Sequence, residues 1–215
     1  MPAPTADQLT SSFKGFLKDA GLQGEAILGF AEALAESAAQ ALEKFFSMGQ
    51  VLPGIPTAVD PVSGSGATGG PGSLLPPPAG GPVAAQLEGD IEDNLTAHGI
   101  AGADAPGLAK ALAASLAETV NLFADQTQVM PGIAVAGFVT AAPGSLQPVP
   151  LAGQLEPAVQ DFLEQNKICG AQAPPLAKVV AQAGDKALSL FADQVQVGPG
   201  IACPPGASAA PGNFI

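Results

Sequence analysis

Three stretches of the chain can be laid over one another without a gap, and they decide how the rest of the sequence is interpreted. They read FFSMGQVLPGI over residues 45–55, FADQTQVMPGI over residues 123–133 and FADQVQVGPGI over residues 191–201. The first positions of the three stretches are separated by 78 and then by 68 residues. Fixed offsets of this kind indicate an internal repeat.

The same offsets hold towards the N-terminal side of each stretch. Each unit closes on a second Pro-Gly pair, and the first unit carries six extra residues within residues 59–70. The sequence therefore predicts three units: residues 1–78, which include the Gly/Pro-rich insertion, residues 79–150 and residues 151–215. The matching positions include Leu9, Leu87 and Leu155; Leu17, Leu95 and Leu163; Gly24, Gly102 and Gly170; Phe30, Leu108 and Leu176; and Pro71-Gly72, Pro143-Gly144 and Pro211-Gly212.

Each unit is predicted to contain two helices. In the first unit, apolar residues at helical spacing predict a short helix from about Asp7 to Asp19 and a longer one from about Gly24 to Met48. The matching long helices of the other units are expected to begin at Pro106-Gly107 and at Pro174-Pro175, because proline is tolerated in the first turn of a helix.

The segment after each long helix is predicted to be a short extended piece with a tight turn at Pro-Gly. Strand content should be small, and the Pro-rich joints over residues 72–78 and 144–150 should be stiff, extended spacers. We predict a mainly α fold of three tandem helical hairpins. One hairpin cannot bury its apolar stripe alone, so the units either close compactly around a pseudo-threefold axis, which we favour, or extend along a partner.

Composition excludes several classes of function. The formal charge is −12 with only seven Lys plus Arg residues, which disfavours nucleic-acid binding because a phosphate backbone needs a basic patch. Residues 1–10 lack the basic flank and apolar run of a signal peptide, and no apolar stretch is long enough to span a membrane. We therefore expect a soluble product made inside the cell, and we interpret the sequon at Asn94 as a chance match.

No residue set predicts catalysis, a metal site or a cofactor. The glycine pattern over residues 64–69 is not flanked by a strand and a helix, so we interpret it as a loop. His98 is the only histidine and is predicted to be a polar helix-end residue. Cys169 and Cys203 are expected to be free thiols, a single bridge being the alternative, and Gln23 and Ala101 match the first of them. The acidic pairs Asp90 with Asp93 and Glu88 with Glu92 are expected on a solvated helix face.

The repeated Gln-Val-x-Pro-Gly-Ile motif is the best candidate for an interaction site. It can be a strand that pairs with the edge of a partner, or it can be a turn that closes each unit, and we favour the closing turn. The candidate residues are Gln50, Val51, Pro53, Gly54 and Ile55; Gln128, Val129, Pro131, Gly132 and Ile133; and Gln196, Val197, Pro199, Gly200 and Ile201.

A Pro-Gly-Ile turn followed by a Gly-, Thr- and Ser-rich stretch that ends in Pro-Gly occurs over residues 53–58 and 68–72. It resembles the C-terminal pattern of small structural proteins of phage tails and contractile injection systems, although this chain is triplicated. The resemblance implies a particle component whose partners are other structural proteins or further copies, and whose long glycine loops become ordered only in the assembly. The alternative is a freestanding repeat adaptor that binds an apolar partner helix in a groove between units.

Overall fold

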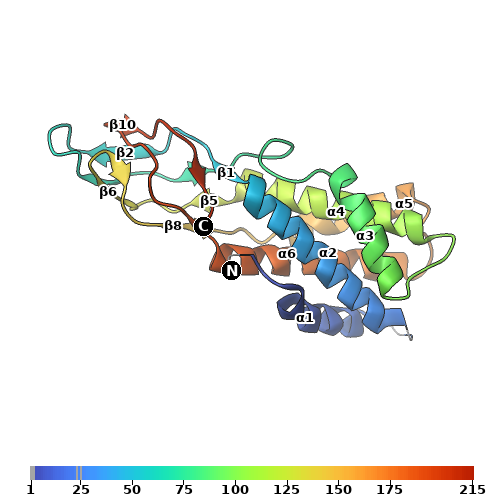
Figure 1. The fold of residues 1–215 in the computed structure, drawn as a ribbon. Coiled ribbons are helices and arrows are strands. Elements are labelled where there is room, and N and C mark those ends of the chain that lie inside the picture. Colours follow the sequence, from blue (N-terminus) through green and yellow to red (C-terminus); the bar gives the residue numbers. More distant parts are fainter. Residues whose placement is uncertain (1–2, 23, 25) are drawn as a thin grey trace.

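The computed structural model describes residues 3–22, 24 and 26–215. Met1 at the N-terminus, Gln23 at the position that matches Cys169, and Glu25 in the predicted second helix lie outside these residues. Six helices make the fold mainly helical, and Figure 1 shows them gathered at one end of the molecule with the strands at the other. The helices are α1 (Ala6–Asp19), α2 (Ala26–Met48), α3 (Ala84–Ala97), α4 (Ala105–Gln126), α5 (Ala152–Gln165) and α6 (Ala173–Gln194).

Local sequence signals set the ends of these helices. The side chains of Gln8 and Gln86 accept hydrogen bonds from the backbone N–H groups of Thr5 and Val83, which precede α1 and α3. Proline stands in the first turn of α4 and of α6, as predicted. The predicted start of the second helix at Gly24 is wrong, because Gly24 has a φ of +145° and α2 begins at Ala26.

The three short helices end in the same way. The residue after each C-cap, Gly21, Gly99 or Lys167, lies in the left-handed region with φ of 73°, 79° and 64°. In each case the following N–H donates back to the carbonyl of a leucine five residues earlier, which closes the last turn. Glycine adopts this conformation without a steric penalty, whereas the Cβ atom of Lys167 adds such a penalty.

The helices pack as a central set of long helices with the short helices around it. The long helices α2, α4 and α6 contact one another at the centre of the bundle, and each short helix lies between two of them. Helix α1 packs on α2 and α6, α3 packs on α4 and α2, and α5 packs on α6 and α4. Small residues let the long helices approach closely, since a Cβ at Gly184 of α6 would lie 2.9 Å from the Cγ2 atom of Thr119 in α4.

An aromatic cluster joins the helices to the strands. The rings of Phe45, Phe123 and Phe191, which are the first positions of the three repeated stretches, are fully buried against one another with centroids 5.3 to 6.0 Å apart. Phe214, near the C-terminus, packs on Phe45 and Phe191 with centroids 5.6 and 5.7 Å away. Edge-to-face and tilted pairs of this kind add to the stabilisation from burial.

The strands are short but more numerous than predicted. The glycine-rich insertion forms the hairpin of β2 and β3, and the joint segments begin as β4 and β8 rather than as extended spacers. The strands are β1 (Gln50–Val51), β2 (Pro56–Val59), β3 (Gly66–Thr68), β4 (Gly72–Ser73), β5 (Gln128–Val129), β6 (Ala134–Ala136), β7 (Val139–Thr140), β8 (Gly144–Gln147), β9 (Gln196–Val197), β10 (Gly206–Ala207) and β11 (Gly212–Asn213).

All strand pairings are antiparallel, and they close two rings. In the ring next to the helices, β4, β5, β8 and β9 are neighbours, and β1 pairs with β11. Bridges from Val51 to Leu74 and from Val197 to Phe214 complete this ring. In the outer ring β10, β2, β3, β6 and β7 are neighbours, and a bridge from Val139 to Ala202 completes it.

One expectation about the loops is therefore wrong. The glycine loops are ordered within a single chain rather than only in an assembly. The physical reason is that each short strand finds its pairing partner in a distant part of the same chain, where the backbone donors and acceptors of both are satisfied.

Candidate functional site

The repeated Gln-Val-x-Pro-Gly-Ile motif lies at the junction of the two rings. Its Gln-Val pairs are strands β1, β5 and β9. The glycines of the turns, Gly54, Gly132 and Gly200, have φ of 103°, 93° and 99°, which confirms the predicted tight turn. The isoleucines that follow are buried, while the prolines are exposed.

Hydroxyl side chains from another part of the chain hold each of these turns. The Oγ1 atom of Thr68 accepts a hydrogen bond from the backbone N–H of Ile133 at 3.0 Å, and Thr140 does the same for Ile201 at 3.0 Å. Ser208 Oγ accepts from the N–H groups of Gly54 and Ile55, each at 3.0 Å. The backbones of the three hydroxyl residues also exchange hydrogen bonds with the turns they hold.

The contacts form a cycle. Residue 68 of the first sequence unit holds the turn of the second, residue 140 of the second holds the turn of the third, and residue 208 of the third holds the turn of the first. Both edges of β1, β5 and β9 are in contact with other segments of this chain. The motif thus closes the fold, its strand edges are not free for a partner, and binding of another molecule to it stays a prediction.

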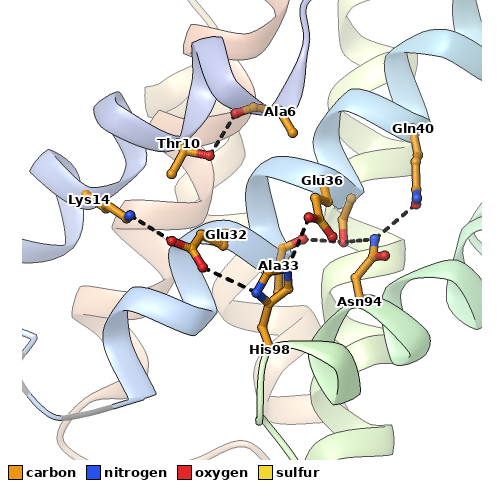
Figure 2. A network of polar contacts seen from close by, with 10 residues as sticks. Ala6, Thr10, Lys14, Glu32, Ala33, Glu36, Gln40, Asn94 and His98 are labelled. Carbon is orange, nitrogen blue, oxygen red and sulfur yellow. Dashed lines mark hydrogen bonds and ion pairs between the residues drawn. The ribbon is translucent and has the colours of Figure 1, made fainter.

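A polar clasp, which we define as Lys14, Glu32, Glu36 and His98, joins α1, α2 and the end of α3 (Figure 2). Nδ1 of His98 lies 3.3 Å from Oε2 of Glu32, and Nε2 lies 3.1 Å from Oε1 of Glu36. Each ring nitrogen of His98 therefore faces a carboxylate oxygen, one from Glu32 and one from Glu36. His98 is the C-cap of α3, as the predicted helix-end role requires.

The clasp also holds α1. Nζ of Lys14 donates to Oε1 of Glu32 at 2.8 Å, and this ammonium group keeps the pKa of Glu32 below its ordinary value. Directly beneath, a Cβ at Gly29 would collide with the carbonyl oxygen of His98, so the glycine lets the α3 end approach α2. The clasp therefore fastens three helices to one another.

Asn94 extends this polar contact into the buried face between α3 and α2 (Figure 2). Its side-chain amide donates to Ser37 Oγ at 3.1 Å and to Gln40 Oε1 at 3.0 Å. Sequence reasoning missed this role, although a signal was present: the matching positions in the other units are Phe16 and Phe162, and the positions that match His98 are Ala20 and Asn166. A buried asparagine in place of phenylalanine marks the α2–α3 contact as chemically distinct.

The other residues singled out from the sequence are dispersed. Asp90 pairs with Lys44 at 2.6 Å and Glu88 lies 3.8 Å from Lys110, while Glu92 and Asp93 are exposed. The glycine pattern over residues 64–69 contains strand β3 and leads into no helix. Among the described residues, no group of three or more His, Cys, Asp or Glu side chains is placed to hold a metal ion.

The two cysteines are free and differ in environment. Cys169 is exposed, whereas Cys203 is buried, and burial raises the pKa of the Cys203 thiol.

An apolar pocket, which we call the end pocket, opens at the end of the bundle where the helix pairs are connected. Its volume is about 370 Å³. Among the residues that the structure describes, no charged side chain lines it. Two sets of matching positions meet in it, of which the second was not recognised in the sequence. The lining residues are Phe30, Leu108 and Leu176; Leu22, Ile100 and Ile168; and Leu17, Ala26, Ile27, Cys169, Gln172 and Ala173.

The fold defines a mainly helical protein with a six-helix bundle and a closed β end. Comparison with protein-family models, with curated proteins and with solved structures finds no significant match. None of the described helices is long and apolar enough to cross a membrane.

Proposed function

We propose that this chain is a non-enzymatic structural subunit of a phage or phage-like particle, in its tail, baseplate or capsid. We further propose that its three sequence units are equivalent helical hairpins closed around a pseudo-threefold axis. The observation that carries both proposals is the cycle in which Thr68, Thr140 and Ser208 each hold the turn of another unit. A closed body with this symmetry suits a position on a threefold or sixfold axis of a larger assembly.

The distribution of charge supports a role in assembly. Residues 50–82, 127–151 and 195–215, which form the β end, contain Asp60 as their one charged side chain, although the whole chain has a net charge of −12. Solvent-exposed surfaces of soluble domains ordinarily carry charged residues of both signs, and the buried centres of interfaces are depleted in them. A β end almost without charge therefore favours contact with another protein.

The placement of His98 and of the two thiols supports the proposal that the chain is not an enzyme. The imidazole of His98 is engaged with two carboxylates, and neither thiol lies within the clasp that holds this imidazole. A catalytic centre needs a nucleophile or a base that faces a substrate cavity, together with groups that stabilise the transition state. The clasp uses its charges to join helices.

Sedimentation of the native source material tests the proposed role. The protein, followed by mass spectrometry across a density gradient, is expected in particle-sized fractions and is expected to remain there after a salt wash. Recovery only in the fractions of free protein contradicts the particle role. The proposal also implies synthesis in the cytoplasm and incorporation into the particle.

A deletion tests the pseudo-threefold closure separately. A variant without residues 79–150 loses Thr140 and the Ile133 turn, so the cycle cannot close. We expect it to lose cooperative unfolding. A two-unit variant that unfolds at the temperature of the full chain contradicts a shared three-unit core.

The end pocket favours a second candidate function, that of an adaptor which receives an apolar helix of a partner protein. Its lining of leucine, isoleucine and phenylalanine is the kind of surface that binds the apolar face of a helix. A monomer that binds amphipathic helical peptides, and is absent from particle fractions, is the result that this candidate predicts.

A further inference from the structure

A strap, which we define as residues 203–214, joins the third sequence unit to the first. Its strands β10 and β11 pair with β2 and β1 of the first unit. Between the two strands, Ser208 Oγ accepts hydrogen bonds from the N–H groups of Gly54 and Ile55. In Figure 1 the strap is the red segment that runs beside β2. The strap therefore holds a unit that is remote from it in the chain.

The strap binds the first unit mainly through its backbone. Residues 204–212 are all Pro, Gly, Ala or Ser, so they bury little apolar side-chain surface. The N–H of Ser208 donates to the carbonyl oxygen of Ile55 at 2.8 Å, and its carbonyl oxygen accepts from Gly54 at 2.9 Å. Phe214 supplies the one large apolar side chain. An extended segment that adds to a strand edge by backbone pairing is a common mode of recognition between separate chains.

The surface under the strap is matched to this segment. Gly49 stands where the other units have Thr127 and Val195. A Cβ at Gly49 would collide with the ring of Phe214, so the glycine makes room for the phenylalanine. The segment that fits the first unit in this way is its own strap or the strap of another copy.

Closure by the strap spans more of the chain than the other two closures do. The hydroxyl groups of Thr68 and Thr140 hold turns that are 65 and 61 residues away, whereas Ser208 and Ile55 are 153 residues apart. The effective concentration of two segments falls as about the −3/2 power of the chain length between them, so it is about fourfold lower for the third closure while the chain folds. The third closure is therefore the one that a second copy supplies most readily.

The helices at the same seam share the fewest polar contacts. Asn94 and an ion pair join α3 to α2, and two hydrogen bonds between Gln126 and Gln154, at 2.8 and 3.1 Å, join α5 to α4. Among the described residues, α6 and α1 share only the hydrogen bond from Gln194 to Gln8, at 3.5 Å. The polar contacts between the third and first units thus lie mainly in the strap.

We infer that the strap exchanges between copies of this chain, so that the strap of one molecule holds the turn of the first unit in another. When the strap leaves, the edges of β1 and β2 and the N–H groups of Gly54 and Ile55 lose their partners, and such edges pair with another strand. The strap of a second copy satisfies the same donors and acceptors. Fully extended it reaches about 40 Å, so it can cross to an adjoining β end. Repeated exchange links copies into dimers or longer chains.

A reversible lock tests the exchange in the full-length protein. Gln50 and Asn213 lie opposite each other on β1 and β11, so Gln50→Cys with Asn213→Cys brings two thiols within reach of one disulfide. Diamide forms this bond and takes up the two electrons and two protons that the thiols lose. The native thiols are removed by Cys169→Ser and by Cys203→Val, the latter after Val135, the matching residue of the second unit.

The reduced and the oxidised forms of this variant are compared after the same treatment. Each is kept at high concentration in urea just below its own unfolding midpoint, returned to buffer, and measured by size-exclusion chromatography with light scattering. We expect dimers and larger species from the reduced form and from the chain without the two new thiols, and monomers from the oxidised form. Equal association of both forms shows a contact that does not use the strap, and a reduced form that stays monomeric shows no exchange, so either result overturns the inference.

Two single-thiol chains identify the contact itself. Chains with Gln50→Cys and with Asn213→Cys, both without the native thiols, are mixed, treated in the same way, diluted and oxidised. We expect disulfide-linked dimers of the two different chains. In the matched control, Ser145→Cys replaces Asn213→Cys, because Ser145 is the matching residue of the second unit and pairs with Gln196. At least about tenfold fewer linked dimers are expected in this control, and equal linking shows random collision and overturns the inference.

The inference goes beyond the proposed function. These tests use purified protein, so a chain that never exchanges its strap can still be found in particle-sized fractions, and a chain that exchanges it can be absent from them. Failure of the inference is therefore distinguishable from failure of the particle role.

Discussion

The hydroxyl groups that hold the turns provide the sharpest test of how the chain closes. We consider Thr68→Val and Thr140→Val, which remove one oxygen and keep the shape of the side chain. Both threonines are buried, with 3% and 2% of their surface exposed. The backbone hydrogen bonds between these residues and the turns do not involve the side chain and remain possible in the variants.

The cost follows from the N–H group left behind. Each variant leaves the N–H of Ile133 or Ile201 without the hydroxyl acceptor 3.0 Å away, in a position where both isoleucines are buried. A buried donor without a partner costs about 1–3 kcal/mol. For a chain of this length, about 2 kcal/mol lowers the unfolding midpoint by about 4–8 °C. The two losses should be equal, and they should add in the double variant.

Thermal and urea unfolding followed by circular dichroism measure both quantities. Thr96→Val is the matched control, because Thr96 is exposed on α3 and the two residues have similar helix propensities. If Thr68→Val and Thr140→Val each fall within about 0.5 kcal/mol of this control, the hydroxyl groups do not stabilise the ring and the reasoning fails.

Four further outcomes are expected. Lys167→Gly should stabilise the chain by about 0.5–1 kcal/mol in urea unfolding, since glycine has no steric penalty at a φ of 64°. The control Lys178→Gly, inside α6, should destabilise the chain by about 1 kcal/mol. A loss of stability in Lys167→Gly argues against the left-handed conformation at the end of α5. Gly184→Ala should lower the free energy of unfolding by about 1–3 kcal/mol, because the new Cβ clashes with Thr119. Adding Thr119→Ala should restore part of this stability, and additive effects in the double variant contradict the close contact. Ellman's reagent should titrate one thiol rapidly in the folded chain and two in denaturant, because Cys203 is buried with a raised pKa; rapid reaction of both contradicts that burial. The backbone N–H groups of Ser63 and Val62 lower the pKa of Asp60, so its turn is stabilising above the ordinary value of 3.8 and is lost as the pH falls through the lower folded value. The amide chemical shifts of these two residues should move with a midpoint below 3.8, and a midpoint at or above 3.8 contradicts the turn.

The helices were predictable because their signal is local. Apolar residues at helical spacing, the proline in the first turn of α4 and α6, and the glycines at the ends of α1 and α3 all act within a few residues of the position they determine. The predicted first helix differs from α1 by one residue at its start. The offsets of the repeat also brought Phe30, Leu108 and Leu176 together before their shared pocket was known.

The rings could not be predicted in the same way, since their strands are two to four residues long and pair with distant segments. A two-residue strand has no periodicity to read. One signal was available, however. Thr68, Thr140 and Ser208 each stand four residues before the glycine of the second Pro-Gly pair, and a hydroxyl residue conserved in place within a repeat points to a shared hydrogen bond.

The glycines of the second Pro-Gly pairs also have a structural role, which the side chains packed against them explain. Gly72, Gly144 and Gly212 do not have positive φ. A Cβ at each of them would instead meet the Cδ1 atom of the isoleucine of the motif in the same unit, at 2.8 Å for Gly72 and at 2.4 Å for the other two. The glycines were predicted as unit ends, and the structure shows that they make room for the buried isoleucines.

In the ring next to the helices, the pairing of β11 with β1 differs from the pairings of β4 with β5 and of β8 with β9. The difference bears on how one chain selects the order of its units. The register of β4 with β5 brings Leu74 opposite Thr127, and that of β8 with β9 brings Leu146 opposite Val195. Where β11 meets β1, a phenylalanine stands opposite a glycine, because a Cβ at Gly49 would collide with the ring of Phe214. A large residue matched to a small one fits at this position alone. Exchange of Leu74 or Leu146 into it would leave a cavity beside Phe45, and Phe214 opposite Thr127 or Val195 would be overpacked. Size matching thus directs the C-terminal strand to the first unit and closes the ring within one chain.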